Sequence, residues 1–303
     1  MVHSLFSTGT FTLLGLVTKN GVTTLEQREG TLNELHGRLG FIDSIDLYNR
    51  KDADPQLKPA PLSKKERMYR QFLIYKDFYT TDRPVIVCEG KTDIVYLKYA
   101  IRSLATHFPL LTEVDPGGNV TLKVRLYKYP KSSTARILGL SDGGNSVLPK
   151  FIGTYKEDTD KFRAPGQKQP IIILYDNDAD AQKIRKAIKD AVNVIVKPGD
   201  PYAHVVRNMY AMPTPLPAGT QESVIEDFFE TAIKGTVLGG KTFTKRNKFD
   251  NTQHYGKHIF AEHVVKPKAA TINFDGFRPL LTILENIIKD HAAAVTGTAA
   301  TAP

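Results

Sequence analysis

The sequence predicts an α/β protein whose central sheet is mostly parallel and flanked by helices. Two short apolar runs, PVIVC at 84–88 and IIILY at 171–175, have the length and composition of buried strands. Each run is followed by a segment with apolar residues at helical spacing, at 92–107 and 180–192. Strands that alternate with helices are typical of parallel sheets, because neighbouring parallel strands require a crossover connection.

Other segments extend this pattern toward both ends of the chain. Residues 1–30 mix Thr, Gly and short apolar runs, which indicates a weak hairpin or an edge fragment. Three prolines in 52–63 indicate a linker, and residues 293–303 are expected to be a disordered tail. The other predicted elements are helices at 32–51, 64–79, 255–265 and 277–294, strands at 121–129 and 203–212, a strand end with a glycine turn and a helix at 139–155, a polar loop at 156–169, and an acidic turn or helix at 222–230.

The composition is that of a soluble globular protein with an excess of positive charge. The chain has 303 residues, of which 41% are hydrophobic and 24% charged, and its formal charge is +9. No run approaches the roughly 20 apolar residues that span a bilayer, and the N-terminus is too polar for a secretory signal. The single cysteine, Cys88, excludes a disulfide framework within a monomer and is expected to be a small core residue. We therefore expect a cytoplasmic protein with no membrane partner, and the charge favours nucleic acid as a partner.

Acidic residues follow both buried strands directly. The first strand runs into EGKTD at 89–93, and the second runs into DND at 176–178. If the two strands are parallel neighbours, their carboxyl ends share the edge at which open α/β sheets form their sites. Converging carboxylates repel one another, and a hard cation such as Mg²⁺ or Mn²⁺ removes that repulsion. The pattern therefore predicts a metal platform, with Gly90 allowing a close approach of the backbone.

Each motif taken alone also has a purely structural interpretation. A Glu after a strand is common, and Asp and Asn after a strand often form turns and helix caps. The combination of both motifs, in this order and after two buried strands, favours the metal site over the structural interpretation.

These motifs resemble a known family. CEGKTD at 88–93 and LYDNDAD at 174–180 resemble the two signatures of the TOPRIM domain, E-G-x-x-D after a first strand and D-x-D after a later one. LSDGGNSV at 140–147 resembles the glycine motif between them. The domain is shared by topoisomerases, primases and the overcoming-lysogenization-defect nucleases. The resemblance implies a Rossmann-like TOPRIM fold and Mg²⁺-dependent chemistry on phosphodiesters.

Longer stretches resemble the C-terminal part of retron reverse transcriptases that carry a fused TOPRIM domain. The resemblance divides the chain into a helical thumb-like remnant with a linker at 1–62, a TOPRIM domain with a helical C-terminal extension at 63–292, and the tail at 293–303. The polymerase signature, an aromatic residue followed by x-D-D, is absent, so this chain would not copy RNA by itself. The matching stretches are TLNELHGRLGFIDSIDLYNR, KKERMYRQFLIYKDFY, PVIVCEGKTDIVYLKYAIRSL, ESVIEDFF and YGKHIFAEHVVK.

The TOPRIM resemblance implies a role for each acidic residue of the two motifs. Glu89 would be a metal ligand or the general acid/base at the scissile phosphate. Asp176 and Asp178 would hold Mg²⁺, and Asp93 would support that ion or a second one.

Two later residues extend the same comparison. Glu226, or its neighbour Asp227, resembles the later acidic position of TOPRIM nucleases and would complete a second metal site; the alternative is an acid on a helix surface. Lys257 resembles the late lysine of the overcoming-lysogenization-defect nucleases and would stabilise charge on the reacting phosphate. Its alternatives are a solvated lysine or a simple phosphate clamp.

Basic side chains near the motifs are candidates for phosphate contacts, although a plain salt bridge is an equal alternative for Lys91. The expected partner is DNA or RNA, with retron msDNA and a reverse transcriptase core as further candidates. The candidate phosphate-binding residues are Lys91, Lys183, Arg185, Lys186, Lys245 and Arg246.

Three functions remain open at this stage. The first is an Mg²⁺-dependent TOPRIM nuclease, by resemblance the effector of a retron reverse transcriptase in defence against phage. The second is a non-catalytic module that binds or docks nucleic acid within a retron complex. The third is a primase-like nucleotidyl transferase, for which the sequence shows neither a template channel nor a nucleotide site. Open, converging acids would favour catalysis, and acids neutralised by Lys or Arg would favour docking.

Overall fold

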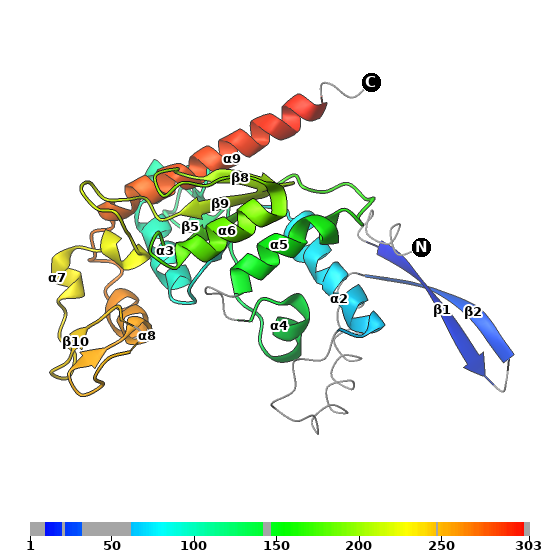
Figure 1. Cartoon of the computed structure of the whole chain (residues 1–303), viewed down its shortest axis with the longest axis horizontal. Coiled ribbons are helices and arrows are strands. Elements are labelled where there is room, and N and C mark those ends of the chain that lie inside the picture. Colours follow the sequence, from blue (N-terminus) through cyan, green and yellow to red (C-terminus); the bar gives the residue numbers. More distant parts are fainter. Residues whose placement is uncertain (1–9, 20–21, 32–61, 142–146, 247, 300–303) are drawn as a thin grey trace.

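The computed structural model describes residues 10–19, 22–31, 62–141, 147–246 and 248–299 (Figure 1). Its centre is a five-stranded sheet in the order β6-β3-β7-β9-β8. Strands β6, β3, β7 and β9 are parallel, and β8 joins the edge antiparallel to β9. This confirms the predicted α/β class and the predicted parallel neighbours. The strands are β3 (Val85–Cys88), β6 (Arg125–Leu126), β7 (Ile171–Tyr175), β8 (Ala203–Val206) and β9 (Met209–Pro213).

Both faces of this sheet are buried, which explains why β3 and β7 are continuous apolar runs. Val85 and Val87 of β3 point into a core formed with helices α2, α4, α5 and α6. Ile86 and Cys88 point to the opposite face, which packs against α3 and α9. Cys88 is fully buried, as expected for a core residue. The helices are α2 (Lys64–Ile74), α3 (Asp93–Ser103), α4 (Ser132–Leu138), α5 (Val147–Thr159), α6 (Ala181–Val192) and α9 (Arg278–Ala299).

The predicted helix at 64–79 is confirmed as α2 continued by a π-helical turn. Ser63 Oγ accepts a hydrogen bond from the Glu66 N–H, and the Glu66 carboxylate accepts one from the Ser63 N–H. This capping box fixes where the helix begins. The π-helical turn η2 (Tyr75–Tyr79) then carries the chain toward β3.

The N-terminal hairpin is also confirmed. Strands β1 (Thr10–Lys19) and β2 (Val22–Thr31) pair antiparallel with Thr10 opposite Thr31, and Figure 1 shows the hairpin projecting from the rest of the chain. The helix predicted at 32–51 and most of the 52–63 linker lie outside the described residues. The thumb-like character of 1–62 and the boundary near residue 62 therefore stay predictions.

The strand predicted at 121–129 is wrong in its extent. The segment divides into β5 (Val120–Leu122), which pairs antiparallel with β4 (Thr112–Val114), and the two-residue β6 of the main sheet. The Lys123 N–H bonds to Leu111 O, at the end of the β4–β5 ribbon, whereas the Arg125 N–H bonds to Pro84 O beside β3. Alternation of apolar and polar residues cannot reveal that successive residues pair with different partners.

The single strand predicted at 203–212 is a hairpin. Strands β8 and β9 are joined at Arg207-Asn208, and Arg207 adopts φ +59°. No glycine follows Asn208, so the reversal lacks the Asn-Gly pair that most strongly predicts a two-residue hairpin turn. Asn208 stabilises the corner, because its side chain donates to Phe78 O and Gln169 O and accepts a hydrogen bond from Tyr155 Oη.

Two further boundaries differ from the predictions. The strand end expected at 139 is instead the end of helix α4, which Gly139 terminates at φ +75°. The 156–169 loop begins later than predicted, since α5 continues to Thr159. The tail predicted to be disordered from 293 is helical to Ala299, where α9 ends, because its alanines favour helix.

The C-terminal third adds short elements around one end of the sheet (Figure 1). Among the residues that the structure describes, no helix combines the length and apolar character needed to cross a bilayer. The remaining elements are η3 (Ala105–His107), η4 (Ile225–Phe228), α7 (Thr231–Lys234), β10 (Thr242–Phe243), β11 (His254–Tyr255), α8 (Lys257–Ile259), η5 (Phe260–Val265) and η6 (Asp275–Phe277).

His291 gives α9 a pH-sensitive anchor. The ring is 4% exposed, its Nε2 lies 2.9 Å from Gln167 O, and its Nδ1 lies 3.3 Å from Tyr210 Oη. Nε2 must donate to the carbonyl, so the neutral tautomer leaves Nδ1 to accept from the tyrosine. Burial lowers the pKa of His291, the hydrogen bond to Gln167 O offsets part of that effect, and the charge of His204 adds slightly to the lowering.

We expect the stability of the wild type to fall on acidification relative to a His291→Gln variant. Below about pH 6.5 the imidazole takes up a proton in the unfolded protein but not in the folded protein. The free energy of unfolding therefore falls as the pH falls, by less than the limiting ~1.4 kcal/mol per pH unit. Buried carboxylates with raised pKa values act in the opposite direction, and the wild-type-minus-variant difference removes them. Urea midpoints between pH 8 and 5 measure the effect; parallel curves for the two proteins would contradict it.

Candidate functional site

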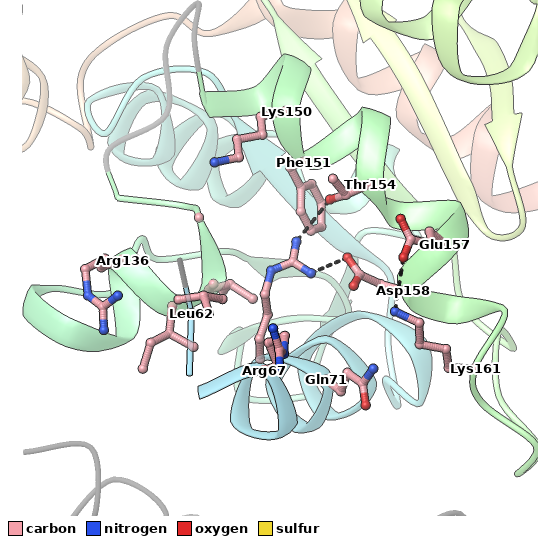
Figure 2. A pocket seen from close by; sticks show the side chains of 14 residues that line it. Leu62, Arg67, Gln71, Arg136, Lys150, Phe151, Thr154, Glu157, Asp158 and Lys161 are labelled. Carbon is pink, nitrogen blue, oxygen red and sulfur yellow. Dashed lines mark hydrogen bonds and ion pairs between the residues drawn. The ribbon is translucent and has the colours of Figure 1, made fainter. Parts of the chain in front are cut away.

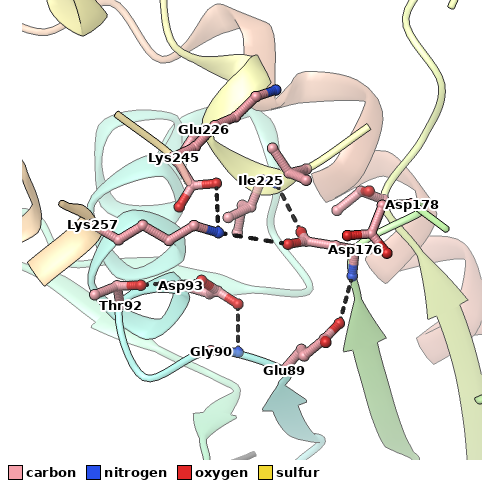
Figure 3. Close-up of polar contacts among 12 residues, drawn as sticks. Glu89, Gly90, Thr92, Asp93, Asp176, Asp178, Ile225, Glu226, Lys245 and Lys257 are labelled. Atoms are coloured by element: carbon pink, nitrogen blue, oxygen red, sulfur yellow. Dashed lines mark hydrogen bonds and ion pairs between the residues drawn. The ribbon is translucent and has the colours of Figure 1, made fainter. Parts of the chain in front are cut away.

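The parallel pairing of β3 and β7 brings the two acidic motifs together. Cys88 lies opposite Leu174, so both strands end at the same edge of the sheet. The Glu89 N–H continues the ladder to Leu174 O at 2.8 Å, and the Asp176 N–H donates to Glu89 Oε2 at 3.0 Å (Figure 3). The predicted convergence of Glu89 and Asp176 is therefore confirmed.

The turn after β3 folds Asp93 back over the strand end. Asp93 is buried, and its Oδ2 accepts a hydrogen bond from the Gly90 N–H at 2.7 Å. A Cβ at position 90 would lie 2.7 Å from Asp93 Oδ1, so any side chain there would displace the carboxylate. Gly90 thus permits the close approach of backbone and acid that the sequence suggested.

The three residues of the DND motif have different hydrogen-bond partners. Asn177 is buried and is held by a bridge in which it exchanges backbone hydrogen bonds with Ser223. Asp176 Oδ1 accepts the Ile225 N–H at 3.0 Å. Asp178 instead accepts from N–H groups that open helix α6, at 2.9 and 3.2 Å. Asp178 thus also has the capping role that the structural interpretation predicted.

The segment that follows β9 supplies a buried ion pair. Lys257 Nζ lies 3.1 Å from Glu226 Oε2 and 3.7 Å from Asp176 Oδ2 (Figure 3). Glu226 is fully buried, its Oε2 faces Lys257, and its Oε1 has no hydrogen-bond partner among the described residues. Tyr96 Oη donates to Lys257 O at 3.1 Å and so fixes the start of α8. Glu226 is therefore not an acid on a helix surface, and Lys257 is not a solvated lysine.

The acids at this edge are harder to ionise than ordinary carboxylates. Burial raises the pKa of Glu89 to about 7, with the Asp178 and Asp93 charges adding to the effect. Burial, followed by repulsion from Asp93, raises the pKa of Asp176 well above its ordinary value. Burial likewise raises the pKa of Glu226. Burial and mutual repulsion therefore disfavour the charged forms of these carboxyl groups.

The same surroundings favour the charged form of Lys257. Burial alone would lower the pKa of Lys257, but the charges of Glu226, Asp176 and Asp93 outweigh it and the pKa is raised. The ammonium group therefore stays charged at neutral pH. One cation faces several carboxylates, which leaves an electrostatic deficit that a second cation would remove.

Glu89, Asp93, Asp176 and Lys257 line a pocket of about 510 Å³. Asp178 and the exposed Asp180 lie on its acidic side. Lys245 and Arg246 line it as well, and Lys245 pairs with Asp227 at 3.0 Å. The pocket thus combines an acidic floor with cationic side chains from the chain that precedes α8.

The donor set fits a divalent cation in its chemistry. It offers carboxylate oxygens, the ligands that Mg²⁺ prefers, and the buried Glu226 Oε1 has no hydrogen-bond partner among the described residues. Within the described residues, however, no three Asp, Glu, His or Cys side chains are grouped as a metal-ion site. The reason is visible in the contacts: Asp93 and Asp178 turn to backbone N–H groups, and Lys257 lies between Glu226 and Asp176.

The predicted phosphate-binding residues do not form one surface. Lys245 and Arg246 line the pocket, whereas Lys91 is exposed outside its lining and makes no ion pair with a described residue. Arg185 turns inward, with Nη1 3.2 Å from Asn177 Oδ1. Lys183 and Lys186 are exposed and pair with acids of their own helix.

Sequence reasoning missed several contributors. The Ile225 N–H and Tyr96 position Asp176 and Lys257, and no motif marks either residue. Glu222 also lines the pocket and was not singled out, although the acid-rich run at 222–227 was a signal for it. Asp227, named from the sequence as the alternative to Glu226, caps η4 by accepting the Val224 N–H at 3.0 Å.

No protein-family model matches the chain, and no solved structure gives a significant match to it. Any functional assignment therefore rests on the pocket itself.

The Lys257–Glu226 pair predicts an asymmetric response to substitution. Lys257→Met removes the cation from a carboxylate-rich site, and we expect a loss of roughly 2–3 kcal/mol. This is less than the ~3–5 kcal/mol for a fully buried pair, because the lysine side chain is 28% exposed. Glu226→Gln relieves repulsion and should be close to neutral, and adding it to Lys257→Met should recover stability. Urea denaturation of the four proteins tests this.

Lys266→Met removes an exposed helical partner of Glu262 and is the control, with no measurable loss expected. A larger cost for Glu226→Gln than for Lys257→Met would show that the lysine does not neutralise the cluster.

Proposed function

We propose that this protein cleaves phosphodiester bonds of nucleic acid in a reaction that depends on a divalent metal ion. One observation carries the proposal: Glu89, Asp93, Asp176, Asp178 and Glu226 line or adjoin one pocket at the carboxyl ends of parallel strands. Acids at this edge of an α/β sheet are typical of binding and catalytic sites. The raised pKa values of Glu89 and Asp176, caused by burial and by the charges of neighbouring acids, are typical of functional clusters.

Glu89, Asp176 and Asp178 are the proposed Mg²⁺ or Mn²⁺ ligands, with Asp93 and Glu226 supporting the ion or a second one. When bound, the ion supplies Lewis acidity toward a phosphoryl oxygen and lowers the pKa of a coordinated water. This proposal accounts for carboxylates that outnumber the buried cations at the site.

The chain's own residues contribute a proton carrier and a positive charge. Burial raises the pKa of Glu89 to about 7, so its carboxyl group can accept or donate a proton near neutral pH. Lys257 stays charged because of its acidic neighbours and offers its ammonium to negative charge that develops on the phosphate. Lys245 and Arg246 would hold substrate phosphates at the mouth of the pocket.

The finer identity belongs to the same proposal. The EGKTD and DND motifs support a TOPRIM nuclease, and the longer stretches support the effector part of a retron reverse transcriptase. In that setting the chain would act in the cytoplasm beside a polymerase core, on DNA or RNA that includes retron msDNA.

Metal binding is testable without catalysis. If the acids bind Mg²⁺, saturating Mg²⁺ should raise the melting temperature, by an amount equivalent to about 2.7 kcal/mol at a hundred times the dissociation constant. Asp176→Asn/Asp178→Asn should abolish the shift, because both substitutions remove charge while keeping the shape. Asp190→Asn, an exposed acid of α6 outside the pocket, should keep it. An equal Mg²⁺ shift in the wild type and the double variant would exclude these residues as ligands.

Cleavage is tested on labelled single-stranded and duplex DNA and RNA with Mg²⁺ or Mn²⁺. We expect cutting that EDTA stops, that Asp176→Asn/Asp178→Asn lowers at least about a thousandfold, and that Asp190→Asn leaves unchanged. Binding without cutting on all four substrates, with unchanged affinity in the double variant, would contradict the nuclease.

A non-catalytic docking module is the second candidate, favoured by the contacts of Lys257. This lysine neutralises Glu226 and Asp176, as expected of acids with a structural role. The Mg²⁺ experiment separates the two candidates, since a structural ion pair requires no second cation. No described feature favours the primase-like alternative over these two.

A further inference from the structure

A second pocket lies between helices α2, α4 and α5 and shares no lining residue with the acidic pocket. Its volume is about 480 Å³, within the range of small-molecule sites. Five cationic side chains line it, against two carboxylates (Figure 2). The cations are Arg67, Arg70, Arg136, Lys150 and Lys161.

At the centre of this pocket a guanidinium group is held in place. Arg70 pairs through Nη1 with the buried Asp158, and its Nη2 donates to Thr154 Oγ1 at 3.0 Å. These two contacts use two of the five guanidinium N–H donors and fix the plane of the group. An arginine oriented in advance loses little entropy when it binds an anion with its remaining donors.

Two other cationic side chains of the lining form no ion pair with a described residue. Arg136 is paired with Glu66, and Lys161 with Glu157, so these two neutralise acids of the fold. Arg67 and Lys150 are exposed and make no ion pair with any described residue. Figure 2 shows Lys150 on the α5 side and Arg67 on the α2 side of the pocket. The unmatched charge therefore comes from two helices.

The chemistry of the lining selects a class of anion. A phosphate monoester carries about −1.5 to −2 charges at pH 7, which matches two uncommitted cations, whereas a carboxylate or a phosphodiester carries one. The planar Arg70 and the hydroxyl of Thr154 offer donors suited to phosphate oxygens. Leu62, Ile137 and Leu138 supply an apolar wall for the group that bears the phosphate.

We propose that the α2–α4–α5 pocket binds a terminal phosphate monoester. A free 5′-mononucleotide and the 5′-phosphorylated end of a nucleic-acid strand present this same group. The site does not depend on the acidic pocket, and its occupancy requires no metal ion.

The test measures equilibrium binding to the full chain in EDTA at fixed salt. The probes are adenosine 5′-monophosphate, adenosine, and one oligonucleotide with either a 5′-phosphate or a 5′-hydroxyl. Arg67→Gln/Lys150→Gln is the test variant. Lys64→Gln/Lys65→Gln removes the same charge from exposed positions of α2 outside the pocket lining and is the matched control.

We expect at least one phosphorylated probe to bind more tightly than its unphosphorylated counterpart. The test variant should lose about tenfold or more in affinity for that probe, and the control variant should bind like the wild type. Binding of the mononucleotide alone would identify a free nucleotide as the ligand. Binding of the phosphorylated strand, displaced by the mononucleotide, would identify a strand end.

The proposal is overturned if neither phosphorylated probe is preferred, if the test variant binds like the wild type, or if the control variant loses as much affinity. Because EDTA is present throughout, this binding is measured without metal-dependent cleavage. Failure of the nuclease proposal and failure of the phosphate site are thereby measured separately.

Discussion

The site depends on one constraint, the in-register parallel pairing of β3 with β7. Because both strands are buried on both faces, their side chains are apolar until the sheet ends, and the first polar residues of each emerge at the same edge. The contact between the Asp176 N–H and the Glu89 carboxylate is a direct result of that register. A shift of one residue would turn every side chain of a strand to the opposite face and separate the two acids.

This geometry buries acidic side chains, and other parts of the chain stabilise them with hydrogen bonds and an ion pair. The backbone N–H groups of Gly90 and Ile225 donate hydrogen bonds to the carboxylates of Asp93 and Asp176. Lys257 arrives from the far C-terminal segment, fixed by Tyr96. These partners are too few to neutralise the cluster, and the pKa of Asp176 consequently stays raised by burial and by Asp93. A fold that needed these acids only for stability would gain by replacing some of them with neutral residues.

The pattern of apolar and acidic residues was enough to predict the two strands and the acids that follow them, but not the contacts made inside the site. The runs 85–88 and 171–175 identified their strands, and the residues after each run identified Glu89 and Asp176. The β8–β9 hairpin was missed because Arg207 adopts a positive φ without the glycine that usually signals it. The ion pair of Lys257 with Glu226 could not be derived from spacing, since it depends on how distant segments pack against the sheet.

The two pockets show how a chain with a net charge of +9 can carry an acidic site. Negative charge is concentrated at the sheet edge, and part of the positive excess lies in the α2–α4–α5 pocket. The two pockets act differently on a phosphate group. The basic pocket attracts it, whereas the acidic pocket repels it unless a cation is bound. Phosphate would therefore be held in the basic pocket whether or not metal is present, and the acidic edge would admit it only with metal.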